Sequence, residues 1–352
     1  MTPRPGAERV RVAAGKLGQH PQDHGWREFY RLLANGLATP ARELPQLHDL
    51  VDSAFAGRPT SSDSHLVTLL GIAVKSADPA GFGALVDDRP VADRLARLEA
   101  VLSRHRRQVD EVLAHRQNSF TGARRFLVPQ VLLAACFARQ DQPASFADLG
   151  TGLGVLPRQL NCKTLFDRYA PDLTWPGGRP AYQPIRLAAR YGVDRGPFPD
   201  QRWVQTCYGP SVFYTAQFRE LIEALELPEL RAVEVGYHEL DLTDRTGLSR
   251  FLTEHGINAV NLSYTLYELD PASRAGVLDT LAGSLHPPGF AIITEPTAEL
   301  AQPGCTVSVR DHADPRLRRV CSVSDGHFTG TVRPLEWFDR FVARYPIRFE
   351  RG

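Results

Sequence analysis

The fold is decided by Asp148-Leu149-Gly150-Thr151-Gly152-Leu153-Gly154, which follows the apolar pair Phe146-Ala147. An acidic residue at the end of a short apolar strand, followed by three glycines at alternate positions, predicts a tight turn from strand to helix. Glycine suits such a turn because positive φ angles cost it little and because its missing Cβ lets backbone N–H groups approach a ligand. The stretch therefore indicates a nucleoside-binding turn, with an ordinary glycine-rich turn as the alternative.

The spacing of these glycines separates two kinds of cofactor site. A dinucleotide fingerprint places its third glycine one position later, where this chain has Val155. Asp-x-Gly-x-Gly-x-Gly instead resembles the first motif of class I S-adenosylmethionine-dependent methyltransferases, whose ligand carries an amino acid in place of a pyrophosphate. This resemblance implies that Asp148, Gly150, Gly152 and Gly154 contact S-adenosylmethionine.

The hydrophobic pattern changes at Ser145. Before it, apolar residues at helical spacing predict helices over about 25–57 with a break at Pro40, 64–74, 91–115 and 122–139. After it, short apolar strands alternate with helices, as expected for a parallel sheet. The strands are expected at 146–149, 190–193, 232–235, 259–263 and 291–294, and the helices between them at 155–169, 212–225, 246–255 and 271–285.

We therefore expect an α/β fold: a Rossmann-like class I methyltransferase sheet of about seven mostly parallel strands, with an all-α N-terminal cap. Residues 1–20 have no periodicity and are expected to form a mobile arm. Residues 21–143 are expected to form the helical cap, and residues 144–352 the S-adenosylmethionine-binding domain. The tail should add strands at 306–309 and 319–322, a helix over 334–344 and a last strand near Ile347.

Acidic residues follow the second and third expected strands. Asp194 ends the second strand and is of the type that accepts hydrogen bonds from two ribose hydroxyls, although a solvated turn aspartate is the alternative. After the third strand, Asp241 could accept from the adenine amino group while Leu242 covers the ring. As an alternative, the stretch from Asp241 to Asp244 could cap the helix that begins near Thr246, and both roles can hold together.

The fourth strand leads into the segment richest in chemical groups, Asn261-Leu262-Ser263-Tyr264-Thr265-Leu266-Tyr267-Glu268. Its carboxyl end should face the sulfonium methyl, with Asn261 and Ser263 near the cofactor. Tyr264 and Tyr267 could supply aromatic walls and Glu268 a base. The alternative is that both tyrosines pack in the core and Glu268 is exposed.

Trp203 and Tyr208, between the second and third strands, and Glu295 at the end of the fifth are candidates for the substrate pocket. A metal site is not expected. Asp311-His312 with Asp314 is the only compact cluster of ligand types, and it has no paired histidine spacing.

The composition limits the partners. The net charge is +1, with 41 basic and 40 acidic residues, so no global field favours nucleic acid or an anionic membrane. The five cysteines are widely spaced and no signal peptide or membrane span is visible, which predicts a cytoplasmic protein with reduced thiols. The sequence leaves the oligomeric state open, and a homodimer is one possibility.

The layout of the whole chain is also similar to a bacterial family known as domain of unknown function 2332. The counterparts of that family's motifs would be Gln117-Asn118-Ser119, Gly150 to Gly154, Asp167-Arg168-Tyr169 and Tyr191-Gly192-Val193-Asp194. Ser119 departs from the family pattern, which has an acid there, and Asp167-Arg168-Tyr169 comes later than the pattern allows. This resemblance implies the fold and no substrate.

Together these features predict S-adenosylmethionine-dependent methyl transfer to a small-molecule acceptor in bacterial secondary metabolism. Two alternatives stay open. The protein could cyclise or cleave the cofactor with release of methylthioadenosine, or it could be a non-catalytic regulator that binds it.

Overall fold

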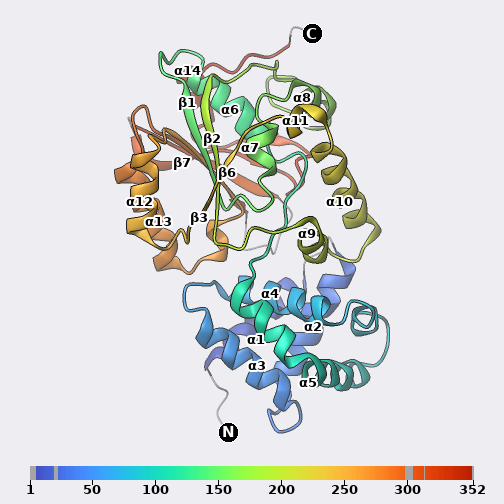
Figure 1. Ribbon diagram of the computed structural model, residues 1–352. Helices are drawn as coiled ribbons and strands as arrows, with labels where there is room; N and C mark the ends of the chain where they lie inside the picture. The colour runs from blue at the N-terminus through green and yellow to red at the C-terminus, as the bar shows by residue number, and fades with distance from the viewer. Residues whose placement is uncertain (1–4, 20–22, 298–303, 313, 351–352) are drawn as a thin grey trace.

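The computed structural model describes residues 5–19, 23–297, 304–312 and 314–350 (Figure 1). The first part of the chain is helical, with elements α1 (Pro5–Leu17), α2 (His24–Ala38), α3 (Pro45–Gly57), α4 (Asp63–Ala77), the short helix η1 (Phe82–Leu85), α5 (Val91–His115) and α6 (Leu127–Phe137). Strands and helices then alternate as β1 (Ala144–Leu149), α7 (Val155–Gln159), α8 (Lys163–Tyr169), η2 (Ala170–Asp172), β2 (Leu187–Asp194), α9 (Gln201–Cys207), α10 (Val212–Leu225), α11 (Pro228–Arg231), β3 (Gly236–Glu239), α12 (Arg245–Glu254), β4 (Ala259–Ser263), η3 (Leu266–Glu268), α13 (Pro271–Ser284) and β5 (Phe290–Pro296). The last part comprises β6 (Cys305–Asp311), β7 (Asp314–Val323), β8 (Val332–Pro334) and α14 (Phe338–Arg344).

Eight strands form one mixed sheet in the order β3-β2-β1-β4-β5-β6-β7-β8. The pairs among β1 to β5 are parallel, whereas β6, β7 and β8 each run antiparallel to the strand before them. Because the order reverses beside β1, the parallel part has the Rossmann-like arrangement and opens a crevice at its carboxyl edge. The expected α/β fold is confirmed, with eight strands instead of about seven. The last strand expected near Ile347 is only an isolated bridge between Pro180 and Phe349.

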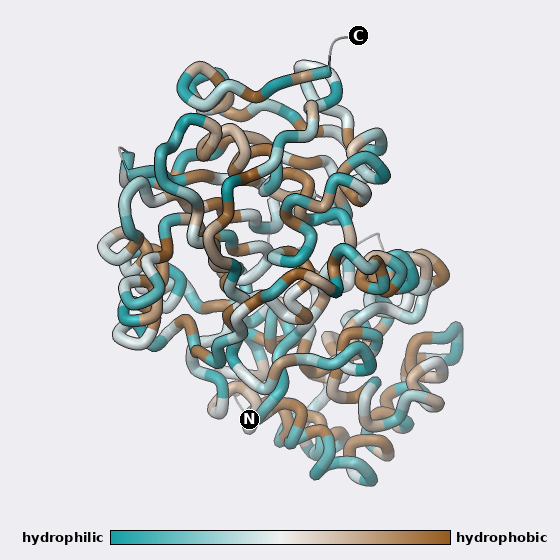
Figure 2. The backbone as a smooth tube through the Cα atoms, turned by 45° about the horizontal axis from the view of Figure 1, so that its top comes forward, coloured by the Kyte–Doolittle hydropathy of each residue, from teal (hydrophilic) through white to brown (hydrophobic). Residues whose placement is uncertain are grey.

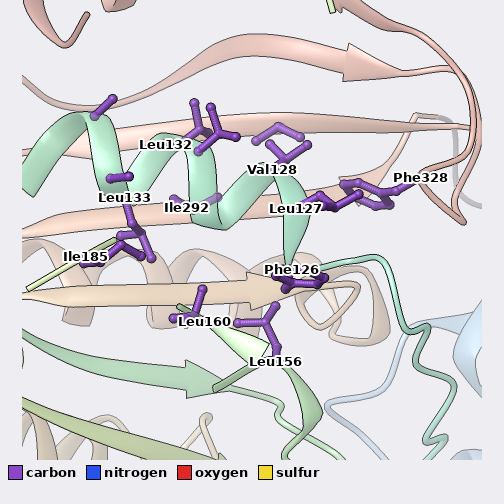
Figure 3. Packing of buried hydrophobic residues seen from close by; sticks show 14 of the residues in the cluster. Phe126, Leu127, Val128, Leu132, Leu133, Leu156, Leu160, Ile185, Ile292 and Phe328 are labelled. Atoms are coloured by element: carbon purple, nitrogen blue, oxygen red, sulfur yellow. The ribbon is translucent and has the colours of Figure 1, made fainter. Parts of the chain in front are cut away.

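Both faces of β1, β4 and β5 are buried, which explains why these parallel strands are almost continuously apolar. Phe146 of β1 and Ile292 of β5 belong to a core that includes α6, α8 and α14, whereas Ala147 and Ile293 face α12 and α13 on the other side. Figure 3 shows Leu132 and Leu133 of α6 close to Ile292. Helix α6 thus packs on the sheet although it precedes residue 143, and the division into cap and sheet domain stays a prediction.

Helices α1 to α5, called the cap below, share one hydrophobic core. Figure 2 shows hydrophobic and hydrophilic positions alternating along these helices, as expected for helices with one buried face. In α5 the buried stripe includes Leu98, Leu102 and Val109. The cap core continues into Trp203 of α9 and Tyr214 of α10, so this insertion after β2 joins the cap to the sheet.

The prediction of a mobile N-terminal arm is wrong for residues 5–17, which form α1. Val10, Ala13, Ala14 and Leu17 are buried against the cap core. Their spacing is helical, but alanine is only weakly hydrophobic. The surrounding charged residues and glycines therefore hide the periodic pattern in the sequence. Residues 1–4 and 20 of the expected arm lie outside the described residues.

Two expected elements after β1 also differ from the structure. The third strand is 236–239 instead of 232–235, because β3 is an edge strand whose side chains are largely exposed and therefore carry no apolar run. The helix expected over 155–169 is interrupted at Asn161, whose φ of 66° lies in the left-handed region.

Candidate functional site

A cavity of about 240 Å³ lies between the carboxyl edge of the sheet and the cap. The sheet side is formed by the glycine turn, the ends of β2 and β4, and the loop after β3. The cap side is formed by parts of α2 and α4 and by the linker between α5 and α6, and Gly304, Gly326 and His327 close a further side. The crevice that the strand order creates is therefore covered by helices.

The glycine turn has the backbone geometry that the sequence predicts. Gly150, Gly152 and Gly154 have φ angles of 79°, 55° and 65°. A Cβ on Gly150 would lie 2.3 Å from Thr265 Oγ1, and one on Gly152 would lie 2.9 Å from Ser119 Oγ. Gly150 and Gly152 line the cavity, whereas Gly154 is the N-cap of α7 and does not. The turn therefore brings its backbone close to groups from two other segments.

Asp148 is held in place by side chains around it. Its Oδ1 accepts a hydrogen bond from Asn261 Nδ2 at 2.7 Å and its Oδ2 accepts one from Thr151 Oγ1 at 2.8 Å. Burial raises the pKa of Asp148 to about 6, and these hydrogen bonds limit the rise. Asn261 is fully buried and does not line the cavity, so it orients Asp148 from behind; Ser263, further along β4, does line it.

Asp194 and Asp241 both line the cavity, as does Leu242. Asp194 Oδ2 accepts from the Gly152 N–H at 2.7 Å, and burial raises the Asp194 pKa to about 6. Asp241 forms an ion pair with Arg195 at 3.3 Å and accepts from Thr243 in a local turn. Asp244 is the N-cap of α12, so the stretch from Asp241 to Asp244 does cap that helix, through Asp244.

The turn after β4 is fixed by a buried carboxylate. Glu295 accepts hydrogen bonds from the backbone N–H groups of Thr265, Leu266 and Tyr267, at 3.2, 3.0 and 2.6 Å. Burial raises the pKa of Glu295 to about 7. Glu295 was predicted to be a substrate-pocket residue, but it does not line the cavity. It shapes the turn that carries Tyr264, Tyr267 and Glu268, and these three residues do line the cavity.

Tyr264 has an unusual backbone conformation for a residue with a side chain. Its φ is 56°, in the left-handed region that costs a bulky residue free energy. The Arg125 guanidinium lies 4.2 Å from the centre of its ring, and its hydroxyl is buried beside Cys305. The tyrosine is thus held in a strained position at the cavity wall.

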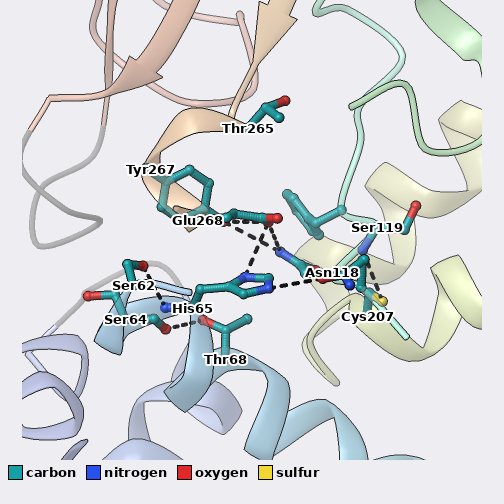
Figure 4. A network of polar contacts seen from close by, with 12 residues as sticks. Ser62, Ser64, His65, Thr68, Asn118, Ser119, Cys207, Thr265, Tyr267 and Glu268 are labelled. Carbon is teal, nitrogen blue, oxygen red and sulfur yellow. Dashed lines mark hydrogen bonds and ion pairs between the residues drawn. The ribbon is translucent and has the colours of Figure 1, made fainter. Parts of the chain in front are cut away.

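Glu268 meets residues of the cap (Figure 4). Its Oε1 lies 3.5 Å from His65 Nδ1 and accepts hydrogen bonds from Asn118 Nδ2 at 3.4 Å and Tyr267 Oη at 3.3 Å. Burial raises the pKa of Glu268 well above its usual value and lowers that of His65 to about 3. The neutral forms of both groups are therefore favoured. The alternative of an exposed Glu268 does not hold in this structure.

Trp203 and Tyr208 are buried but do not line the cavity. Trp203 Nε1 donates to the Gln117 carbonyl at 2.9 Å, and the Tyr208 hydroxyl donates to the Thr121 carbonyl. Both therefore hold the linker between α5 and α6, which lines the cavity, from its outer side.

Sequence reasoning missed the cap's own contribution to the site. His65, Asn118, Ser119 and Arg125 line the cavity. No local pattern identifies them, because their side chains meet the sheet only through the packing of the cap. Gln117-Asn118-Ser119 stood out solely through the resemblance to the family of unknown function.

The described part of the chain holds no group of three or more His, Cys, Asp or Glu side chains arranged to bind a metal ion. No helix there is long and apolar enough to cross a membrane. All five cysteines are buried and free.

No family model matches the chain, and no curated protein matches its sequence. The resemblance to the bacterial family of unknown function therefore has no support. Three solved structures similar to the chain are described as methyltransferases. One is a 1,6-didemethyltoxoflavin-N1-methyltransferase from Burkholderia thailandensis with bound 1,6-didemethyltoxoflavin and S-adenosylhomocysteine, at 17% identity over 55% of this chain and 61% of that protein, TM-score 0.23.

The second is an amino pentose methyltransferase from Micromonospora echinaspora with bound S-adenosylmethionine, at 12% identity over 62% of this chain and 80% of that one, TM-score 0.25. The third is an O-methyltransferase family protein from Burkholderia thailandensis, at 14% identity over 98% of this chain and 90% of that one, TM-score 0.27. At these TM-scores the similarity carries no argument of its own, so the fold rests on the strand order and the function on the site.

Proposed function

We propose that the protein binds S-adenosylmethionine in the cavity and transfers its methyl group to a small-molecule acceptor. The observation that carries the proposal is the convergence of the glycine turn, Asp194 and the turn from Tyr264 to Glu268 on one cavity under a helical cap. A crevice at the carboxyl edge of a parallel sheet is the usual place for a nucleoside ligand.

The residues present fit this cofactor. The left-handed glycines allow backbone N–H groups to approach it closely, and the Asp194 carboxylate at the end of β2 suits two ribose hydroxyls. Asp241 and Leu242 offer an acceptor and an apolar contact for an adenine. Asp148 stabilises the turn through Thr151.

When bound, S-adenosylmethionine would supply an electrophilic methyl group to a nucleophilic atom of the acceptor, with S-adenosylhomocysteine as the leaving group. The protein's part is to align the acceptor and to exclude water. The rings of Tyr264 and Tyr267 favour a cation beside them. Glu268, once deprotonated, can take a proton from the acceptor, with Asn118 and Tyr267 orienting its Oε1.

Calorimetric titration with S-adenosylhomocysteine tests the proposal. We expect saturable binding to the native protein and at least about tenfold weaker binding to Asp194→Ala, since charge-assisted hydrogen bonds to the ribose would be lost. Asp244→Asn, a change of the same residue type at the N-cap of α12 outside the cavity, should bind as the native protein does. Absence of binding to the native protein would refute the proposal, and unchanged affinity in Asp194→Ala would refute the ribose role.

Turnover of labelled S-adenosylmethionine separates the two alternatives from methyl transfer. Release of methylthioadenosine without an added acceptor would indicate a cyclase or lyase. Tight binding without turnover across a panel of small molecules would indicate a regulatory protein.

A further inference from the structure

The end of the cavity that borders α2 holds a buried carboxylate with one unused oxygen. Asp23 is 3% exposed and caps α2, with Oδ1 accepting from the Trp26 N–H at 2.7 Å. Its Oδ2 is buried and has no hydrogen-bond partner. The nearby Lys75 ammonium instead donates to the carbonyls of Thr206 and Tyr208, at 3.0 and 2.6 Å. Within the described chain Asp23 therefore has no ion pair.

The same cavity holds a buried guanidinium without a carboxylate. Arg125 is 6% exposed, and its Nη1 donates to the Phe120 carbonyl at 2.9 Å while its Nε has no partner. Its remaining contacts are with the rings of Tyr264 and Phe120, at 4.2 and 5.5 Å from their centres. No ion pair of Arg125 exists among the described residues.

Aromatic side chains separate these two charges. The rings of Phe120 and Tyr214 are 5.2 Å apart, and Phe120 contacts Arg125. Burial raises the pKa of the Tyr214 hydroxyl, the Asp23 charge adds to the rise and the Arg125 charge opposes it. Asp23, Phe120, Arg125 and Tyr214 all line the cavity. One wall of the cavity therefore has an acidic end, an apolar middle and a basic end.

An unpaired buried charge is costly unless a partner compensates for it. A ligand that carries a positive charge at one end and a negative charge at the other would compensate the Asp23 carboxylate and the Arg125 guanidinium together. We propose that this part of the cavity recognises a zwitterionic methyl acceptor, with a cationic nitrogen at Asp23, a carboxylate at Arg125 and an apolar segment against Phe120 and Tyr214. The inference rests on the proposed function, since it names the acceptor class of the same site.

Calorimetry on the full chain saturated with S-adenosylhomocysteine tests this inference. The probe is 4-aminomethylbenzoate, whose ammonium and carboxylate lie at opposite ends of a ring, and it is compared with benzylamine and benzoate. We expect the zwitterion to bind about tenfold or more tightly than the two compounds that carry a single charge. Equal or absent binding of the three compounds would overturn the inference.

Charge-removing variants assign the two ends. Asp23→Asn keeps an N-cap residue on α2 and should weaken the zwitterion and the amine while sparing the acid. Arg125→Met keeps apolar contact with Tyr264 and should weaken the zwitterion and the acid while sparing the amine. Asp244→Asn and Arg319→Met, at a helix cap and a surface ion pair outside the cavity, are the matched controls and should bind as the native protein does.

The proposed cofactor also carries a zwitterionic amino acid group. A further measurement therefore distinguishes binding of the cofactor by Asp23 and Arg125 from binding of the acceptor. Methylthioadenosine lacks that amino acid. If both variants lose affinity for S-adenosylhomocysteine but not for methylthioadenosine, Asp23 and Arg125 bind the cofactor and the acceptor assignment is overturned. If the native protein binds neither nucleoside, the proposed function fails first, and the failure is visible before any acceptor is added.

Discussion

His65 of the cap lies with its Nδ1 3.5 Å from Oε1 of Glu268, at the end of the fourth strand. This contact is the point at which the cap and the sheet share two buried titratable groups. The backbone reinforces it, because the Ser62 N–H donates to the Glu268 carbonyl at 2.8 Å and the Asp270 N–H donates to the Thr60 carbonyl at 2.8 Å. The cap is therefore fixed to the strand end where methyl transfer is proposed.

Replacement of Glu268 should change the pH dependence of stability. Burial raises the folded-state pKa of this carboxyl above its usual 4.5, so its contribution to stability is complete below that value and is lost as the pH rises through the raised pKa. Glu268→Gln should therefore gain about 1–3 kcal/mol relative to the native protein between about pH 5 and pH 8. Urea unfolding across this range measures the difference. Glu336→Gln, on the surface, is the control and should keep the native pH dependence in this range. If the free energy of unfolding of Glu268→Gln changed with pH as that of the native protein does, the prediction would be contradicted.

Removal of the Glu295 carboxylate should loosen the turn after β4. Glu295→Ala leaves three N–H groups without their acceptor, and we expect the free energy of unfolding to fall by about 2–4 kcal/mol. Thermal and urea unfolding test this, with Glu336→Ala as the exposed control. The turn carries Glu268, so turnover should fall as well. A loss of less than about 0.5 kcal/mol would show that the three hydrogen bonds contribute little.

Gly152→Ala tests the close approach of the cap to the glycine turn. The left-handed φ costs an alanine about 1–2 kcal/mol, and its Cβ would lie 2.9 Å from Ser119 Oγ. Gly256→Ala is a matched control, since its φ is 56° and no atom lies within 4 Å of the added Cβ. Both variants should lose stability, but only Gly152→Ala should also weaken S-adenosylhomocysteine binding. Equal binding by the two variants would rule out a role of this position in the site.

Trp203→Phe tests whether α9 supports the cavity from outside. The substitution keeps an aromatic ring but removes the hydrogen bond to the Gln117 carbonyl, at a cost of about 1 kcal/mol. Hydrogen exchange of the backbone amides at 117–121 should become faster, and exchange in α12, remote from this contact, serves as the control. Unchanged exchange at 117–121 would mean that the linker does not depend on Trp203.

The strands of the sheet centre could be predicted because each is a short apolar run whose two faces are both buried. β3 could not be located in the same way, since an edge strand with exposed side chains has no such run. Helix α1 was missed because alanines fill much of its buried face. Glu295 was expected to line the substrate pocket, but three backbone N–H groups bind its carboxylate and turn it into a structural residue.

The sequence by itself determined the glycine turn and the acidic strand ends. Both depend on residues that are close in sequence: glycines permit the left-handed backbone of the turn, and a short apolar run marks the strand before each acidic residue. Tertiary structure decided which cap residues join them. Asn118 reaches Glu268 from 150 positions away. His65, Asp23 and Arg125 reach the cavity from three further segments. Contacts across such separations depend on how the helices pack on the carboxyl edge of the sheet, and no local pattern encodes that packing.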